Sequence, residues 1–220
     1  MRRLVGMGRP AFLALCLLTW PAQAADQMPA PSAAPLPAGV YRLDPAHASL
    51  LFRVDHLGMS RYTARFTRFD AELTLDPADP GAAGVTATVD PRSLTTHNPD
   101  PSYDFDGKLQ GPEWLDAGRF PQITFRSTAV ELTGPRTARV TGDLDLHGVS
   151  APVTLEVTFN GGYAAFALDP SGSRIGFSAR GTLLRSAFGI AFGIPSPGST
   201  IGVGDAVEVI IEAELARPPP

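Results

Sequence analysis

The chain has 220 residues, of which 18 are basic and 22 acidic, so its formal charge is −4, and 44% of its residues are hydrophobic. This acidic balance makes nucleic acid and anionic lipid surfaces poor partners. Cys16 is the only cysteine, which excludes a disulfide framework and a thiolate metal site. The length corresponds to one domain that can bury roughly two-thirds of its unfolded surface.

Residues 1–24 have the pattern of a cleavable signal peptide. A basic region, an apolar run and a small-x-small cleavage site follow one another: Arg2, Arg3 and Arg9, then residues 11–18, then Ala22-Gln23-Ala24. The mature chain then begins at Ala25, and we expect it in the periplasm. Cleavage leaves 15 basic against 22 acidic residues, a formal charge of −7. An uncleaved anchor and acylation of Cys16 remain the alternatives.

Three segments follow the signal peptide. Residues 25–39 contain four prolines among alanines and a serine, a composition that favours an extended, solvated leader without a packed core. Residues 40–215 form the predicted domain. Residues 216–220 are predicted to be a disordered tail.

Apolar and polar residues alternate with period two through most of this domain, which is the pattern of half-buried strands. The segments with this pattern are residues 50–54, 69–75, 85–89, 123–125, 140–146, 153–159, 175–179 and 207–211. Turn residues separate many of them: Asp76-Pro77, Gly134-Pro135, His147-Gly148 and Gly161-Gly162. We predict eight or nine strands, joined mostly by short turns.

Strands this close in sequence favour antiparallel pairing, because a parallel crossover needs a dozen or more connecting residues. An open sheet of this size would expose an apolar face and two edges. Closure into a barrel hides both at once. The pattern therefore predicts an all-β, antiparallel barrel of about eight strands, whose interior is either filled by side chains or holds one elongated ligand.

One stretch, between Pro91 and Pro121, breaks the alternation. Turn and capping residues occur there beside aromatic residues at irregular, partly helical spacing. We predict one or two short helices that cover one mouth of the barrel. Tyr103, Phe105 and Trp114 are the candidates for a lid, and a mere plug of the barrel end is the alternative.

Motifs of catalysis are absent from the sequence. It contains no nucleophile elbow, zinc-binding helix, phosphate-binding loop or dinucleotide fingerprint. His56 shares its strand face with Phe52 and Val54, so it is expected to point inward near a strand end. His147 lies in a probable turn, and His47 and His97 receive no role. We expect no catalytic residue, no metal and no cofactor.

Three arginines, Arg53, Arg126 and Arg185, could hold the polar head of a lipid at a barrel mouth while their stems cover apolar surface. The other charged residues alternate with apolar ones on the outward strand faces. A solvated barrel exterior explains them.

Several motifs resemble those of the YceI-like family of secreted bacterial proteins, in the family's order and at suitable spacing. They are residues 41–49 (YRLDPAHAS), 52–60 (FRVDHLGMS), 93–96 (SLTT), 120–128 (FPQITFRST), 142–149 (GDLDLHGV) and 185–190 (RSAFGI). The resemblance covers residues 40–215. It implies a lipocalin-like antiparallel barrel with an elongated apolar cavity that binds polyisoprenoids, and in some members quinone-like or fatty-acyl amphiphiles.

The sequence departs from the family pattern at four places. Where family members typically have a His-Leu pair, this chain has Lys108-Leu109, and Ala187 replaces an aspartate. Ala64 and Ala71 stand where the family has glycines, and each adds a methyl group that bears on packing and cavity shape.

The leading hypothesis is a periplasmic carrier, not an enzyme, that holds a long apolar lipid tail inside the barrel. At roughly 25 cal/mol per Å², burying about 500 Å² of a 20-carbon tail contributes on the order of 12 kcal/mol before ordering costs. The predicted ligand-binding residues are the inward-facing strand residues, His56 and the three lid candidates. They are Phe52, Val54, His56, Phe69, Leu73, Val89, Tyr103, Phe105, Trp114, Phe125, Leu144, Val157 and Phe177.

Two rival hypotheses remain open at this stage. One is a redox accessory that acts on bound quinone or haem through His56 or His147. The other is a filled structural barrel that works through contacts of its outer face, since the chain has 12 phenylalanines to fill it. A membrane or redox-protein partner for ligand exchange and a homodimer are also open.

Overall fold

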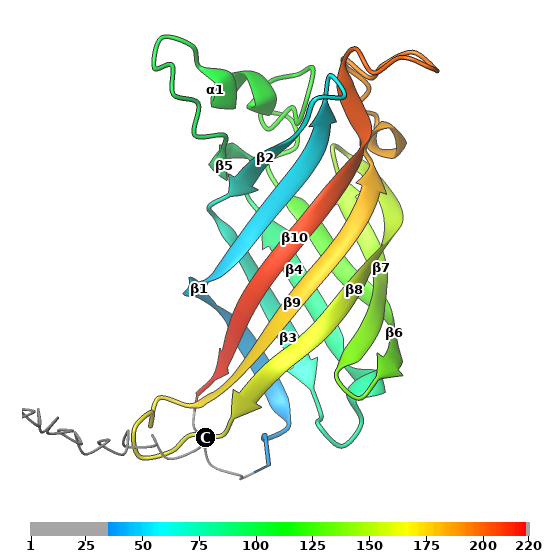
Figure 1. Ribbon diagram of the computed structural model, residues 1–220. Coiled ribbons are helices and arrows are strands. Elements are labelled where there is room, and N and C mark those ends of the chain that lie inside the picture. Colours follow the sequence, from blue (N-terminus) through cyan, green and yellow to red (C-terminus); the bar gives the residue numbers. More distant parts are fainter. Residues whose placement is uncertain (1–34, 219–220) are drawn as a thin grey trace, which may run out of the picture. The chain divides into compact units, whose positions relative to one another are not determined.

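Residues 35–218 are described by the structure, a computed structural model (Figure 1). This part of the chain has ten strands, one α-helix and three short 3-10 helices (η1 to η3). In chain order they are β1 (Gly39–His56), β2 (Ser60–Phe66), β3 (Phe69–Leu75), η1 (Pro80–Ala82), β4 (Gly84–Val89), η2 (Pro91–Ser93), β5 (Leu94–Thr95), α1 (Phe105–Gln110), β6 (Ile123–Gly134), β7 (Thr137–Leu146), β8 (Val149–Tyr163), β9 (Ser173–Leu184), η3 (Arg185–Phe188) and β10 (Val203–Arg217).

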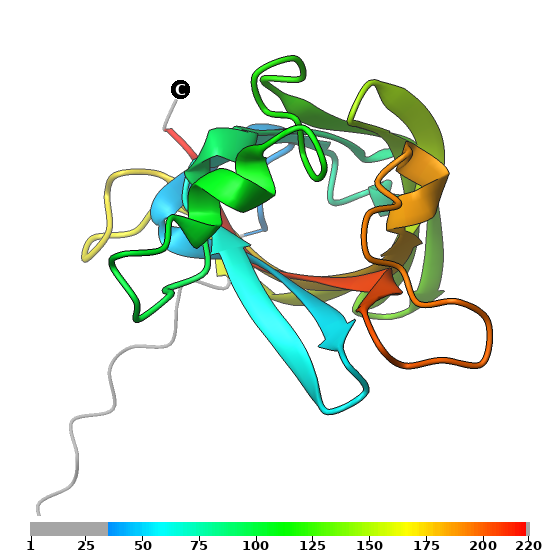
Figure 2. The ribbon, with the colours of Figure 1, turned by 90° about the horizontal axis from the view of Figure 1, so that it is seen from above.

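All of the strand pairings are antiparallel, and the sheet closes on itself. The order runs β10-β9-β8-β7-β6-β4-β3-β1, and β10 pairs with β1 as well, so eight strands form a ring. β2 and β5 extend the sheet from the upper half of β1. Figure 2, seen along the barrel, shows the strands around a central space, with α1 above one side of it. The predicted closed antiparallel barrel is confirmed.

β1 belongs to two parts of the wall because its ladder is interrupted near Pro45. Residues 39–42 pair with β3, and residues 50–56 pair with β2. The register against β10 shifts between Leu43 and Ala48. Proline has no N–H to give to a ladder, so a bulge is where a strand tolerates it.

The structure corrects several sequence-based boundaries. β2 and β5 were not predicted, although Tyr62, Ala64 and Phe66 do alternate with polar residues in β2. β10 continues to Arg217, which pairs with Ser173, so the predicted tail begins two residues too early. β1 starts at Gly39, one residue inside the predicted leader. The predicted signal peptide lies outside the described residues.

The irregular stretch folds as predicted into short helical pieces. The Asp90 side chain accepts a hydrogen bond from the Arg92 amide at the start of η2, and Asp104 accepts one from the Gly107 amide at the start of α1. Leu109 turns inward and is buried. Among the described residues, no helix has the length and hydrophobicity of a membrane span.

Two hairpin turns at the upper end place consecutive residues in the left-handed region. His147 and Gly148 (φ 54° and 76°) join β7 to β8, as the sequence predicts. Leu57 and Gly58 (φ 55° and 66°) join β1 to β2. Turns with two positive φ values match strand twist but favour Asn-Gly or Asp-Gly, so leucine at this position is strained.

The densest packing lies in two clusters toward opposite ends of the barrel. The lower cluster consists of Tyr41, Leu43, Ile175 and Leu215, of which Tyr41 is fully buried and donates its hydroxyl to the Pro37 carbonyl at 2.6 Å. The upper cluster consists of Leu146, Val153, Phe188 and Ile190. Burial of these apolar side chains supplies the main stabilisation of the fold.

Outside the lower cluster, Arg174 ties the loop after β8 to the bulge of β1. Its guanidinium lies 2.6 Å from the Asp44 carboxylate and 3.1 Å from that of Asp169. Hydrogen bonds from Arg174 and His47 are the main reasons why the pKa of Asp44 falls to about 2. Asp169, bonded to Ser171, Tyr163 and Arg174, also has a pKa lowered to about 2.

The low pKa of Asp44 predicts a pH-dependent contribution to stability. Because the carboxyl pKa is lowered from 3.8 to about 2 on folding, its stabilisation is present above about pH 4 and is lost as the pH falls toward 2. We expect Asp44→Asn to lower the urea midpoint at pH 7 and to match the unsubstituted protein near pH 2. Asp79→Asn, at an Asp that makes no capping hydrogen bond, is the control. An equal deficit at both pH values would contradict this account.

Candidate functional site

A cavity of about 1070 Å³ lies inside the barrel, at the upper end of the range of small-molecule pockets, about 300–1,000 Å³. It extends from the upper mouth, where Tyr103 and Phe192 line it, to the lower turns, where Pro77 and Arg136 do. Its wall is almost entirely aliphatic and aromatic. The space therefore suits a long, mostly apolar molecule.

All thirteen residues nominated from the sequence lie on the wall of this one cavity. They are Phe52, Val54, His56, Phe69, Leu73, Val89, Tyr103, Phe105, Trp114, Phe125, Leu144, Val157 and Phe177. Strand alternation brings the ten strand residues together because every second residue of each strand points to the same side of the closed sheet, whereas Tyr103, Phe105 and Trp114 reach the wall from α1 and the loops beside it. Their contact with a ligand stays a prediction.

The inward side chains are incompletely covered by other side chains, because they leave a cavity between them. Phe52, Phe69, Phe125 and Phe177 are only half-buried although they point into the barrel. Side chains of a filled core leave few voids larger than a water molecule. The alternative of a filled structural barrel is therefore wrong for the described part of the chain.

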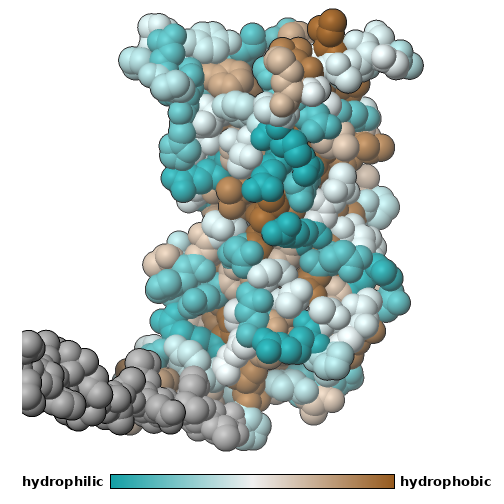
Figure 3. Space-filling model, viewed as in Figure 1, coloured by the Kyte–Doolittle hydropathy of each residue, from teal (hydrophilic) through white to brown (hydrophobic). Residues whose placement is uncertain are grey.

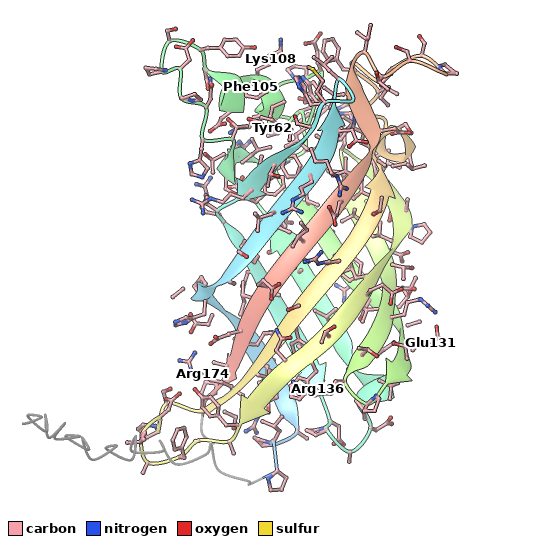
Figure 4. All side chains as sticks on the ribbon, viewed as in Figure 1. Tyr62, Phe105, Lys108, Glu131, Arg136 and Arg174 are labelled. Atoms are coloured by element: carbon pink, nitrogen blue, oxygen red, sulfur yellow. The ribbon has the colours of Figure 1, made fainter. Side chains whose placement is uncertain are left out.

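Aromatic side chains line one side of the upper mouth in an unbroken series. The rings of His56 and Tyr62 lie 6.5 Å apart, Tyr62 meets Phe105 edge-on at 5.9 Å, and Phe105 stacks on Tyr103 at 5.8 Å. Figure 4 labels Tyr62, Phe105 and Lys108 together at this end. The lid candidate Phe105 thus contacts β2 through Tyr62, whose ring also faces His56 of β1.

On the other side of the upper mouth, the buried Arg185 holds the segment between η3 and β10. Its guanidinium donates to the carbonyls of Ile190, Phe192, Val203 and Gly204 at 2.7–3.0 Å and lies 5.2 Å from the Trp114 ring. Burial lowers the pKa of Arg185. Four carbonyl acceptors compensate for its lost hydration.

Of the three arginines considered from the sequence, only Arg185 reaches the cavity wall. Arg53 and Arg126 are not part of it and occupy outward positions on β1 and β6. The role proposed for these two at a barrel mouth is therefore wrong. Each is one residue out of phase with an inward neighbour, Phe52 or Phe125, so each points to the outer face.

Arg136 closes the lower end. In the turn between β6 and β7, it donates to the carbonyl of Phe159 at 2.9 Å and to that of Asn160. Its guanidinium also lies 5.7 Å from the Phe159 ring. Figure 4 labels Arg136 at the end opposite Lys108. This arginine orders the lower turns around the end of the cavity.

The four histidines do not assemble. The ring of His147 lies against Phe120 at 4.8 Å, its Nδ1 is 3.1 Å from the Phe188 carbonyl, and it is not part of the cavity wall. His47 pairs with Asp44 at 3.0 Å, and His97 is exposed. Only His56 lines the cavity. Among residues 35–218, no group of three or more His, Cys, Asp or Glu side chains is placed to hold a metal ion.

The four departures from the family pattern have different surroundings. Lys108 lies on the cavity wall at the upper mouth, and Ala71 lies on the wall opposite Ala87 in the β3–β4 ladder. Ala64 is buried, and Ala187 is exposed on η3. Lys108 and Ala71 are therefore the two that can affect a bound molecule.

Sequence reasoning missed four polar wall residues: Tyr62, Lys108, Arg136 and Thr137. The alternation in residues 60–66 could have identified Tyr62 as inward-facing. Lys108 and Arg136 belong to a helix and a turn, where a strand period carries no information about direction.

The architecture defines the class: a closed, antiparallel, lipocalin-like barrel of eight strands around an apolar cavity. A protein-family model, the YceI-like domain, matches residues 41–215. The chain belongs to the YceI-like family.

Individual relatives agree with this assignment. The UPF0312 protein of Pseudomonas putida strain W619 is 38% identical over 166 residues, which are 74% of this chain and 80% of that protein. The crystal structure of Burkholderia cenocepacia BcnA is similar with a TM-score of 0.65 and 24% identity, over 78% of this chain and 98% of that one. A polyisoprenoid-binding domain from Saccharophagus degradans has a TM-score of 0.54 and 14% identity, over 83% and 100%.

A bulky residue inside the cavity is expected to block long ligands. Ala87 faces Ala71 on the cavity wall, whereas the adjacent Thr88 is exposed on the outer face. We expect Ala87→Trp to weaken binding of the neutral dye N-phenyl-1-naphthylamine by about tenfold or more, since the indole takes up free volume at little cost in stability. Thr88→Trp is the matched control. Equal fluorescence titrations for the two variants would contradict the assignment of the cavity.

Proposed function

We propose that this protein is a periplasmic carrier of a long-chain apolar lipid, a polyisoprenoid, an isoprenoid quinone or a fatty-acyl amphiphile, and that it holds the lipid tail inside the barrel. The observation that carries the proposal is the apolar cavity, which extends from one end of the barrel to the other. Such a space offers many dispersion contacts to a flexible chain and few hydrogen bonds.

Two lines of support favour an isoprenoid tail and a place outside the cytoplasm. A structural neighbour of the same fold is named as a polyisoprenoid-binding domain. The N-terminal pattern of residues 1–24 is that of an exported chain. A water-filled compartment between two membranes is where an insoluble tail needs a protein around it.

The residues of the cavity wall favour a protein that binds a lipid without converting it over an enzyme. His147, one of the two candidates for a redox role, is engaged with Phe188 outside the cavity. His56 stands at the mouth among aromatic rings, and no carboxylate shares the wall with it. The described part of the wall thus offers His56 no carboxylate that would orient its ring as a general base, which favours binding over catalysis.

Native mass spectrometry tests the proposal directly. Protein purified from its own periplasm is expected to carry one apolar adduct per chain, because burial of a long tail stabilises the complex against dissociation. Solvent extraction then identifies the lipid. An empty barrel under gentle conditions, from cells that make such lipids, would refute carriage.

Exposed hydrophobic residues gather around the upper mouth and provide a surface for loading and unloading. Met59 and Ile201 are 76% and 81% exposed, and their loops are joined by a 2.8 Å hydrogen bond from the Leu57 amide to the Gly202 carbonyl. Phe192, 45% exposed, continues this surface into the cavity wall. We refer to these residues with Leu57 as the upper apolar rim. Figure 3 presents hydrophobic spheres among pale ones at this end.

A neutral bilayer surface is the partner that this rim fits. The turn tolerates a strained Leu57 where asparagine or aspartate would be preferred, which is understandable if an apolar tip is needed there. The chain is acidic, so contact with the membrane would depend on apolar insertion and not on charge. A lipid leaving the cavity would then pass from wall to rim to bilayer without crossing water.

Removing the rim is expected to slow exchange without weakening binding. We expect Met59→Ser combined with Ile201→Ser to reduce the rate of lipid transfer to phosphatidylcholine vesicles by about tenfold, because less apolar area enters the interface. Affinity for the bound lipid should change by less than about twofold, since neither residue lines the cavity.

The control is Leu168→Ser, which removes a hydrophobic residue that is 69% exposed in the loop at the opposite end. Fluorescence transfer assays compare the rates. If Leu168→Ser slows transfer as much as the double variant does, the rim is not the exchange surface.

A further inference from the structure

Lys108 is the only lysine of the chain, the other 17 basic residues being arginines. It lies on α1 three residues after Phe105, so both side chains share one helix face, and both line the cavity at the upper mouth. The residue is exposed, and within residues 35–218 its ammonium makes no hydrogen bond or ion pair. A cation with free donors therefore stands beside the entrance of an apolar space.

The carboxylates nearest in sequence, Asp104 and Asp106, make no ion pair with Lys108, and their hydrogen bonds go to other groups. Asp104 accepts a hydrogen bond from the Gly107 amide at 2.8 Å. Asp106 accepts two from Thr96, from its amide at 2.8 Å and its hydroxyl at 2.6 Å. No aspartate or glutamate is among the described residues that line the cavity. In an acidic protein, the cavity wall is thus a region of positive charge.

The two other cationic side chains of the wall are committed to the protein itself. Arg185 donates to four backbone carbonyls, and Arg136 donates to two at the opposite end of the barrel. Only Lys108 has all of its donors available toward a bound molecule. Near it, the side chains of His56, Tyr62 and Tyr103 also line the mouth and make no hydrogen bond to another described residue.

We infer that Lys108 forms the head-group site of this barrel and selects a lipid with an oxyanion head, a carboxylate or a phosphate monoester, over the neutral alcohol with the same tail. The inference rests on the proposed function and specifies its ligand. The tail occupies the apolar wall below, and the ammonium donates charge-assisted hydrogen bonds to the head. Phenol and imidazole groups of the mouth add neutral hydrogen bonds to the same oxygens.

Matched ligands separate the contribution of the head from that of the tail. Hexadecanoate, hexadecyl monophosphate and hexadecan-1-ol compete with N-phenyl-1-naphthylamine for the intact protein at pH 8. We expect the two anions to bind about tenfold more tightly than the alcohol, the factor that one charge-assisted hydrogen bond of ordinary strength produces. The preference should shrink at high salt, because the mouth is open to water. Comparison of the two anions then shows whether the site prefers a carboxylate or a phosphate monoester as the head group.

Substitutions assign the preference to Lys108. Lys108→Gln is expected to abolish the preference by weakening the binding of the two anions, and Lys108→Arg is expected to retain it. Arg119→Gln is the control for net charge, since Arg119 is exposed in the same segment and is not part of the cavity wall. A preference that survives in Lys108→Gln would overturn the inference.

A second measurement is possible because the chain has a single lysine. Reductive ¹³C-methylation gives one lysine signal in the NMR spectrum, separate from that of the chain terminus. We expect this signal to shift with hexadecanoate and not with the alcohol. An unchanged signal on binding of both anions would also overturn the inference, whereas failure of the dye and every lipid to bind would refute the carrier function itself.

Discussion

The pairing of β10 with β1 is the constraint on which the rest of the barrel depends. This ladder runs from Arg42 opposite Ala216 to His56 opposite Val203. Without it, both strands would be edges with unpaired backbone groups, and the apolar face of the sheet would need another layer to cover it. Closure gives the backbone groups of β10 and β1 partners within the wall. The side chains that face the interior can then be mostly apolar.

The distribution of polar groups follows from that closure. Strand residues that point inward are mostly apolar along the barrel, and polar wall residues gather at its two ends, as with His56, Lys108 and Arg136. The middle of the cavity and its two ends therefore have separate roles in ligand recognition. The apolar middle accepts any chain of suitable length and width, because dispersion contacts discriminate weakly between tails. Hydrogen bonds at the mouth discriminate strongly between heads.

The two ends of the barrel differ, so a ligand is expected to enter and leave at one of them. At the lower end, Arg136 binds the carbonyls of the neighbouring strand, and the Arg174 network ties the adjoining loop to β1. At the upper end, the free Lys108 and the exposed Met59 and Ile201 surround the entrance. Ordered turns at one end and an apolar rim at the other favour passage of a ligand through the upper mouth alone.

The sequence by itself determined the class of fold and the wall of the cavity. The period of two assigns most inward residues of the strands, and closure covers the apolar face and the two edges of the sheet at once. For this reason Phe52, Phe125 and Phe177 were identified correctly. Only the tertiary structure decided that the side chains leave a cavity inside the barrel, because this depends on whether their summed volume fills the space that the barrel radius sets. It also decided that Lys108 stands at the mouth while Arg53 and Arg126 do not, since helix and turn positions are set by packing and not by strand period.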